Sequence, residues 1–264
     1  MAESGLSLTR NDLRNAAAFL FGGGVDYTAL AATELTIIDR CIDSALRSVY
    51  DPTPLEGEML SHQWSFMRPE MTISIGPAVP SVVLPDDFGG FEGSIYLSTD
   101  DMGWLPLKLT GIGEILATRQ AEGGEVSVSG APRLLAVQPL PTDGTQGQRF
   151  SLEFWPSADS VYTLKAVYRS NPYQLSSTAV YPLGGMPMAE TLREAVLAAV
   201  ERDVNDTIGV HSQLFKERLK ASVNLDRRMS SPKSFGMNLD GPKQEHHPEF
   251  WRRGYVLYNN ELGD

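Results

Sequence analysis

The chain has 264 residues, of which 42% are hydrophobic, and it carries 22 Lys and Arg against 33 Asp and Glu. This size and composition suit one large globular domain or two smaller ones, and they exclude a disordered chain. The formal net charge of -11 argues against a protein that binds a phosphate backbone or an anionic membrane, because both tasks need clustered cations. The single cysteine, Cys41, excludes an internal disulfide and a thiolate metal cluster, and we expect it to be a core residue.

The start of the chain lacks the basic residues and the apolar run of a signal peptide. No apolar run reaches the length of about 18 residues that predicts a membrane span. We therefore expect the protein to be made and folded in a reducing cytoplasm, without contact with a membrane.

Two amphipathic helices are predicted at the N-terminus. Thr9 and Asp12 match the pattern of a capping box. The apolar residues that follow share one helical face: Leu13, Ala16, Ala17 and Leu20. The glycines 22–24 are expected to end this helix with a left-handed residue. A second apolar stripe predicts another helix that ends at Asp51, before a proline. Its members are Leu35, Ile38, Ile42, Ala45, Leu46 and Val49.

A short aromatic segment follows the second predicted helix. We expect Trp64 and Phe66 to fill the junction between the helices and the next part of the chain. His62 is interpreted as a structural residue rather than a metal ligand, because it stands alone.

From Arg68 to Pro182, short apolar runs alternate with Gly, Pro and Asp, which predicts several short strands in an antiparallel β-sandwich or small barrel. The clearest pair is Phe150–Trp155 and Val161–Tyr168, predicted to form a hairpin around a turn that begins at Pro156. One turn of helix is expected around Ile115–Gln120. The other candidate strands are Met71–Ile75, Ser81–Leu84, Ser94–Leu97, Leu105–Leu109 and Arg133–Val137.

No pattern in the chain has the residues and spacing of a known catalytic or cofactor site. The pairs Asp86–Asp87 and Asp100–Asp101 lack the spacing of a calcium-binding loop, so we interpret them as solvated turn residues. The glycines 22–24 lack the Lys-Ser/Thr of a phosphate loop, and Gly111–Gly113 lacks the third glycine of a dinucleotide fingerprint. We therefore predict no catalytic, cofactor-binding or metal-binding residue, and no enzyme.

The clearest helical pattern lies near the C-terminus. Apolar residues recur at three- and four-residue steps from Leu192 to Val223, which predicts one helix of about 38 residues, or about 57 Å. Gly209 interrupts the pattern and marks either a break or a close packing contact. Because a sandwich alone cannot bury so long a stripe, we expect this helix to pack on the two N-terminal helices.

These predictions combine into an α+β fold with a discontinuous helical bundle, made of two N-terminal helices and one long C-terminal helix. The helical module would comprise residues 1–65 and 186–224, with a β-rich domain, 66–185, inserted between them. Residues 225–264 would form an extended C-terminal arm. A helical pattern that resumes after the strands is the basis of this division.

The arm is predicted to dock on a partner. Residues 225–264 contain 6 Lys and Arg and 6 Asp and Glu, and they are richer in aromatic residues than a disordered tail usually is. Aromatic anchors beside arginines are typical of binding hot spots. The predicted docking residues are Phe235, Phe250, Trp251, Arg252, Arg253, Tyr255, Leu257 and Tyr258. The alternative is an arm folded back on its own subunit. His246 and His247 lie beside two glutamates, but no other ligand accompanies them, so no metal is predicted.

The order of these parts resembles a known family. The helix pair ends in DRCIDSALRSVYDP, followed by WSF, LPDDFGG, the stretch FSLEFWPSADSVYTLKAVYR and the helix PMAETLREAVLAAVERD. In this order the chain resembles, over about residues 8–225, the head-to-tail adaptor (connector) proteins of tailed bacteriophages, especially those with an enlarged β-rich insertion.

The resemblance implies a structural virion protein at the neck, assembled in the host cytoplasm. Such adaptors form a ring, usually of twelve copies, that docks beneath the portal protein, extends the DNA channel and offers a platform to a tail or nozzle protein. Their C-terminal arm often reaches the portal or a neighbouring subunit. An acidic body suits this role, because genomic DNA can pass through a negative channel without specific binding.

Two other functions remain open at this point. The β-rich middle also suits another tail component, such as a tail tube, nozzle or baseplate protein. A carbohydrate-binding or hydrolytic module that uses the sandwich and the acidic loops is the third hypothesis.

Overall fold

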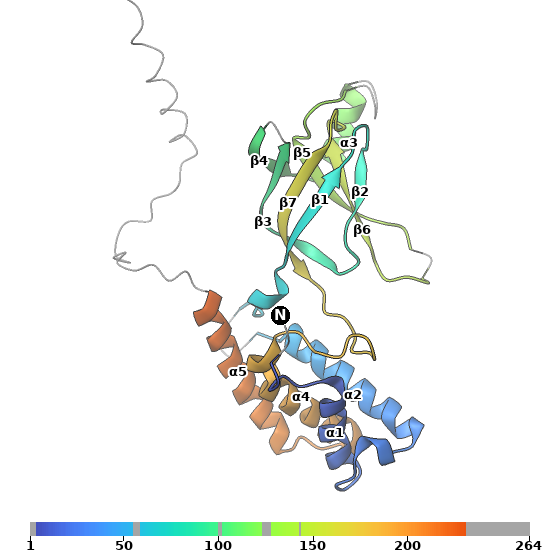
Figure 1. Ribbon diagram of the computed structural model, residues 1–264, viewed down its shortest axis with the longest axis vertical. Helices are drawn as coiled ribbons and strands as arrows, with labels where there is room; N and C mark the ends of the chain where they lie inside the picture. Colours follow the sequence, from blue (N-terminus) through green and yellow to red (C-terminus); the bar gives the residue numbers. More distant parts are fainter. Residues whose placement is uncertain (1–3, 55–58, 100–101, 123–127, 143, 231–264) are drawn as a thin grey trace, which may run out of the picture. The chain divides into compact units, whose positions relative to one another are not determined.

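The computed structural model describes residues 4–54, 59–99, 102–122, 128–142 and 144–230. These residues belong to one compact unit. Within them the chain forms five α-helices, two short 3₁₀ helices and seven strands, so the predicted mixture of α and β structure is confirmed (Figure 1).

The first helix, α1 (Arg10–Phe21), begins as predicted. The Thr9 hydroxyl accepts the backbone N–H of Asp12, and the Asp12 carboxylate accepts the backbone N–H of Thr9, which is the reciprocal arrangement of a capping box. The helix ends at Gly22, whose φ of -101° is not left-handed. Gly23, one residue further on, has a positive φ of 70°, so a left-handed residue does lie within the glycines 22–24, as predicted.

A 3₁₀ turn, η1 (Tyr27–Ala29), leads to the second helix, α2 (Ala32–Tyr50). It ends before Asp51, as the following proline predicts. Cys41 is buried as expected, and its burial raises the pKa of the thiol, whereas reactive thiols have a lowered pKa. The buried residues of α2 are Ile38, Cys41, Ile42, Ala45, Leu46, Val49 and Tyr50.

The prediction of one long C-terminal helix was wrong. The stripe is divided between two helices, α4 (Gly185–Asn205) and α5 (Val210–Ser230). The chain reverses through Asp206, which has a positive φ of 49°, and Ile208 is 87% exposed. A single helix would leave half of its stripe without a partner, whereas two helices that fold back bury theirs against each other.

One hydrophobic cluster contains side chains from α1, α2, α4 and α5. It therefore joins residues from both sides of the strand-rich segment. Trp64 belongs to this cluster and donates its indole N–H to the carbonyl of Val49 at 2.8 Å, while Phe66 packs against the same cluster. Representative members are Leu13, Ala17, Ile42, Val49, Leu192, Val196, Leu219 and Val223.

All seven strands form one sheet in the order β1-β7-β3-β4-β5-β6-β2. Neighbouring strands are antiparallel except β4 and β5, which are parallel. The edge strands β1 and β2 are joined by five residues, 76–80, which span at most about 20 Å, so the sheet is nearly closed (Figure 1). This favours the small-barrel alternative over the sandwich. The strands are β1 (Glu70–Ile75), β2 (Ser81–Val83), β3 (Phe88–Thr99), β4 (Met102–Leu109), β5 (Leu134–Pro139), β6 (Phe150–Trp155) and β7 (Tyr162–Ser170).

The predicted hairpin between β6 and β7 is wrong, although both strands exist. β6 pairs with β2 and β5, whereas β7 pairs with β1 and β3. The connection between them bonds to other segments: Ser157 bridges to Ser129, and the Ala158 carbonyl accepts the N–H of Ala78 at 2.7 Å. The alternation of apolar and polar residues along a strand shows which face of the strand is buried, but it does not identify the strand that pairs with it.

The helix predicted as a single turn is longer. It is α3 (Ile112–Ala121), which follows β4 and packs on the outer side of β5 and β6. A small separate cluster holds it there, in which Ile115 meets Ala136 and Trp155.

The chain leaves and rejoins the helical part at neighbouring positions. The backbone N–H of Tyr168 donates to the Pro69 carbonyl at 3.2 Å, and the Ser170 hydroxyl donates to the Met67 carbonyl at 3.4 Å. The 3₁₀ turn η2 (Ser65–Met67) lies just before this point. The strand segment therefore begins and ends in one place.

One edge of β4 is largely unpaired in the described part of the chain. β4 pairs with β5 only through Lys108 and Leu109. The Lys108 N–H points toward β5, since it donates to the Arg133 carbonyl at 3.1 Å. Because backbone groups alternate along a strand, the nitrogen of Pro106 faces the same edge, and proline has no N–H to offer there.

Candidate functional site

A cavity in the described part of the helical region has a volume of about 700 Å³. It lies between the segment that precedes η2 and the last turns of α5. Met59 and Leu60 at its edge are 94% and 81% exposed, which is unusual for apolar side chains. The lining residues are Met59, Leu60, Ser61, His62, Gln63, Arg68, Arg227 and Ser230.

A buried carboxylate beside this cavity ties α5 to the segment before the sheet. Asp226 is only 9% exposed. Its carboxylate accepts the Ser65 hydroxyl at 2.5 Å and the Ser65 N–H at 3.1 Å, and it lies 2.9 Å from Nε2 of His62. The His62 ring packs edge-on against Trp64. His62 therefore has a structural role, as predicted.

This arrangement lacks the contact that a Ser-His-Asp catalytic site requires. A nucleophilic serine bonds to the histidine, which in turn bonds to the carboxylate. Here the Ser65 hydroxyl and the His62 ring both bond to Asp226. The three residues hold two segments of the chain together.

Asp226 was assigned to the extended arm by the sequence analysis, and that assignment was wrong. α5 continues to Ser230, so residues 225–230 are helical. The sequence does contain a signal: Asp226 follows Leu219 and Val223 at the spacing of one helical face. An acidic residue at such a core-facing position predicts a buried hydrogen-bonding partner.

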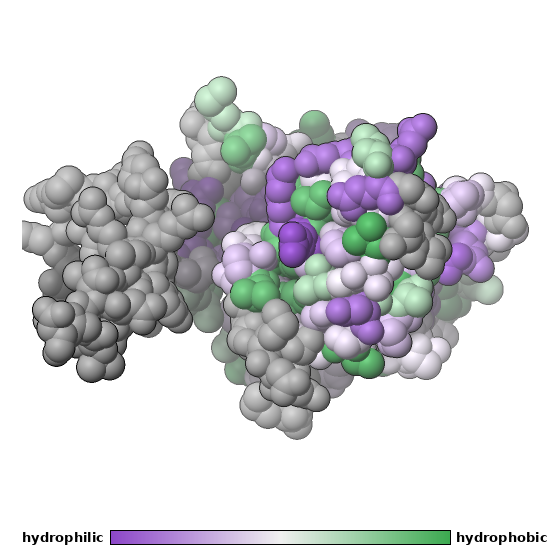
Figure 2. Space-filling model, turned by 90° about the horizontal axis from the view of Figure 1, so that it is seen from above, coloured by the Kyte–Doolittle hydropathy of each residue, from purple (hydrophilic) through white to green (hydrophobic). Residues whose placement is uncertain are grey.

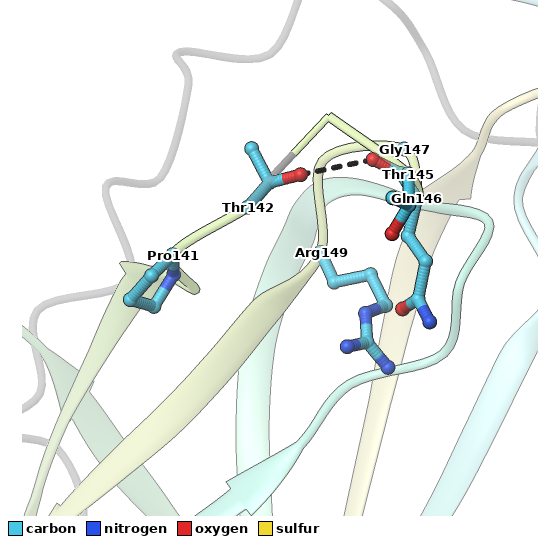
Figure 3. Close-up of a pocket in the computed structure, with 6 residues that line it drawn as sticks. All are labelled: Pro141, Thr142, Thr145, Gln146, Gly147 and Arg149. Atoms are coloured by element: carbon cyan, nitrogen blue, oxygen red, sulfur yellow. Dashed lines mark hydrogen bonds between the residues drawn. The ribbon is translucent and has the colours of Figure 1, made fainter.

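A second cavity, of about 370 Å³, is formed by the loop between β5 and β6 (Figure 3). The Thr142 hydroxyl donates to the Gln146 carbonyl at 3.0 Å and holds the loop in its bend. The side chains of Gln146 and Arg149 lie side by side below this bend (Figure 3). The lining contains one cation and no carboxylate or histidine among its described residues, so it offers no acid-base pair.

A third hollow lies on the outer face of β1, β3 and β7. Its volume is about 380 Å³, and its lining includes Tyr96, Lys165 and Val167. The strand β3 bulges here between Glu92 and Tyr96. The face drawn in Figure 2 mixes hydrophobic and hydrophilic residues and does not gather the hydrophobic ones in one area.

The acidic loops have different roles. Asp86 and Asp87 both lie in a turn, as predicted, but Asp86 is exposed whereas Asp87 is half-buried. The Asp87 carboxylate accepts the hydroxyl of Tyr168 at 3.1 Å, and this contact and burial together raise the pKa of Tyr168. Asp100 and Asp101 lie outside the described residues. Across the described ranges, no group of three or more His, Cys, Asp and Glu side chains could hold a metal ion.

The predicted docking arm falls almost entirely outside the described residues. This applies to each of its predicted anchors and to the two neighbouring histidines, His246 and His247. The anchors are Phe235, Phe250, Trp251, Arg252, Arg253, Tyr255, Leu257 and Tyr258.

Comparison of the chain with protein-family models gives no match, and comparison with curated protein sequences gives none either. None of the helices in the described part of the chain combines the length and the hydrophobicity needed to cross a lipid bilayer.

Proposed function

We propose that this protein is a head-to-tail adaptor of a tailed bacteriophage. In this proposal it forms a ring, with twelve copies as the expected number, beneath the portal protein of the filled capsid. The ring extends the channel for genomic DNA and provides the attachment surface for a tail or nozzle protein. Its role is structural and its location is the neck of the virion.

The observation that carries the proposal is the composition of the helical core. Side chains between Leu13 and Met67 and others between Leu175 and Val223 share one hydrophobic cluster. All seven strands lie in the sequence between these two groups. A helical module built from both sides of a β-rich insertion is the architecture that the resemblance implies, with a pair of C-terminal helices in place of one.

The charge of the chain also supports the proposal. The formal net charge is -11, and a channel formed by many such copies repels the phosphate backbone. DNA that leaves the capsid would therefore not be retained by the ring. The same charge makes copies repel each other, so the ring needs attractive contacts between subunits.

The direct test is binding to a portal ring. The full chain, mixed with the purified portal protein of its phage, is expected to give a complex with a second ring below the portal in electron micrographs. A chain that ends at Ser230 removes the predicted docking arm and is expected to lose most of this binding. A matched variant, with Phe250, Trp251 and Tyr255 changed to Ala in the full-length chain, separates the aromatic anchors from arm length.

If neither the full chain nor the chain that ends at Ser230 forms a complex with the portal protein, the protein is not an adaptor. A subunit found in virions at a place distant from the portal would instead identify it as a tail tube, nozzle or baseplate component.

A further inference from the structure

The exposed side of α5 differs in charge from the rest of the molecule. Helix α5 holds five Lys and Arg and two Asp and Glu, a net charge of +3. The whole chain has a net charge of -11, so all other residues together sum to -14. One helix is therefore a cationic element on an acidic protein.

The cations of α5 all lie on its exposed surface. One of its two acids, Asp226, is buried against Ser65, which leaves Glu217 as the acid that remains exposed. At 100° per residue, Lys216, Lys220 and Arg227 fall within about 40° of each other around the helix axis. The exposed cations are Lys216, Arg218, Lys220, Arg227 and Arg228.

Three of these cations have no ion pair with another described residue: Lys216, Arg218 and Lys220. Some exposed cations elsewhere in the described residues do have such partners, whereas Arg40, Arg47 and Arg133 do not. Arg68, for example, pairs with Glu92 at 2.9 Å. The positive charge of α5 is thus not neutralised by carboxylates of the same described unit.

Apolar side chains flank the cationic stripe. Val210, at the start of α5, and Met229, near its end, are both 66% exposed, and Leu214 is exposed as well. Ile208, in the turn before the helix, is more exposed still. A surface that combines exposed aliphatic side chains with arginine and lysine is suited to a protein partner, whereas a phosphate backbone requires cations alone.

We propose that the exposed face of α5 docks on the acidic surface of a second copy of this chain. The charges are complementary, because the remaining residues of each copy sum to -14. A contact between two different surfaces is heterologous, so it repeats from copy to copy and closes into a ring when the rotation allows. The closed ring rests on the proposed function, but the contact itself can be tested with this chain alone.

The first test measures self-association of the full chain by light scattering and sedimentation. Lys216→Glu with Lys220→Glu is the test variant, and Arg40→Glu with Arg133→Glu is the control, because it changes two exposed arginines elsewhere and shifts the net charge equally. We expect the test variant to associate at least about tenfold more weakly and the control to stay within about twofold of wild type. Raising NaCl from about 50 mM to about 500 mM should weaken the wild type and not the test variant.

A second measurement identifies the partner surface. A mixture of ¹⁴N- and ¹⁵N-labelled chains is treated with a carbodiimide, which joins lysines directly to neighbouring carboxylates. Mass spectrometry is expected to find mixed-label links from Lys216 or Lys220 to Asp or Glu of the other copy. Circular dichroism of every variant establishes that it has folded.

Four results would overturn the inference. The first is that the wild type does not associate at any salt concentration. The second is that the test variant associates as strongly as the wild type, and the third is that the mixed-label links include neither Lys216 nor Lys220. A fourth is that the wild type binds a short DNA duplex in fluorescence anisotropy, the test variant does not, and self-association is unchanged. In that case nucleic acid is the partner. If α5 fails these tests while the chain still binds a portal ring, the adaptor function stands without this contact.

Discussion

At the scale of single residues, buried polar groups connect segments that are far apart in the sequence. Asp226 bonds to both Ser65 and His62, more than 160 positions away. Thr191 and Ser222 share a buried hydrogen bond of 2.6 Å between α4 and α5. Each contact satisfies a group that would cost free energy if it were buried alone.

Replacing Asp226 tests the first of these contacts. Asp226→Ala leaves the hydroxyl and N–H of Ser65 and the His62 ring without their acceptor, so we expect the free energy of unfolding to fall by about 2–4 kcal/mol. Urea unfolding monitored by circular dichroism measures the change. Asp86→Ala, at an exposed carboxylate, is the control and is expected to change stability by less than about 0.5 kcal/mol. Equal effects of the two substitutions would contradict the role of Asp226.

Buried tyrosines make the protein sensitive to alkaline pH. Burial raises the pKa of Tyr50, whose hydroxyl donates to the Leu183 carbonyl at 3.1 Å. Burial also raises the pKa of Tyr162, and its hydrogen bond to Asp159 acts in the same direction. In each case the folded protein retains a proton that the unfolded chain has already released.

The sign of the pH effect follows from this difference. Above about pH 10, where unfolded tyrosines ionise, the unfolded state binds fewer protons than the folded state, so stability falls as the pH rises. Urea unfolding between about pH 8 and pH 11 is expected to show this decline. Tyr50→Phe should be less stable at pH 8 by about 1 kcal/mol, for the lost hydrogen bond, but should lose less stability between the two pH values. An unchanged slope would exclude Tyr50 as a source of the effect.

At the scale of elements, the turn between α4 and α5 depends on Gly209. A Cβ at this position would lie 2.6 Å from Cδ of Glu201. The Glu201 carboxylate accepts the backbone N–H of His211 at 3.2 Å in the first turn of α5, and the His211 ring lies 2.7 Å from the Glu194 carboxylate. Glycine therefore allows a side chain of α4 to cap α5.

The substitution Gly209→Ala is expected to displace Glu201 and remove this cap. We expect a loss of about 1 kcal/mol in the free energy of unfolding, the usual value of a helix cap. Gly113→Ala in α3 is the matched control, since no atom lies within 4 Å of its added Cβ. There alanine should be neutral or stabilising by up to about 1 kcal/mol. Urea unfolding of the two variants is therefore expected to show a lower free energy of unfolding for Gly209→Ala and an unchanged or higher one for Gly113→Ala.

The sequence predicts the elements better than their connections. The capping box of α1, the buried stripe of α2 and the bounds of β6 follow from local patterns and are confirmed. The break at 206–209 was only one of two interpretations of Gly209, because the apolar stripe keeps nearly the same period on both sides of the turn. The partners of β6 and β7 were predicted wrongly, because pairing depends on segments as distant as β1 and β2.

The candidate site was less accessible to sequence analysis than the fold. The arm was predicted from its aromatic residues and, apart from residues 225–230, lies outside the described part of the chain; Asp226, at its predicted start, is a buried residue of α5. The link between Asp226 and Ser65 spans 161 positions, and no local pattern reports such a contact. The sequence analysis did not identify the cationic side of α5. It considered only the net charge of the whole chain and that of residues 225–264, and the second sum separates Arg227 and Arg228 from the other cations of this helix.

At the scale of the whole molecule, the strand segment begins and ends at paired backbone positions. Pro69 and Tyr168 are joined by a hydrogen bond of 3.2 Å, so the two ends of the segment are neighbours in space. Insertions with adjacent ends are tolerated well, because removing them need not move the flanking chain. The helical core would then be able to fold without the sheet.

Excision of the sheet tests this independence. In the variant, residues 70–167 are replaced by Asn-Gly, a two-residue loop suited to joining paired strands. We expect a helical circular dichroism spectrum and a cooperative urea transition. A chain that retains the sheet but ends at Asp206 lacks α5 and its core residues Leu219 and Val223, and it should unfold with lower stability. A shortened chain without a cooperative transition would show that the helical core depends on the sheet.

Pro106 has a consequence for crowded copies of this protein. Exposed strand edges with free N–H groups tend to pair with edges of other molecules and so seed aggregates. On the unpaired edge of β4, one of the nitrogens that would otherwise donate belongs to a proline. Two copies that meet at this part of the edge therefore cannot form an intermolecular sheet hydrogen bond from position 106, and replacing Pro106 with threonine would restore a donor there.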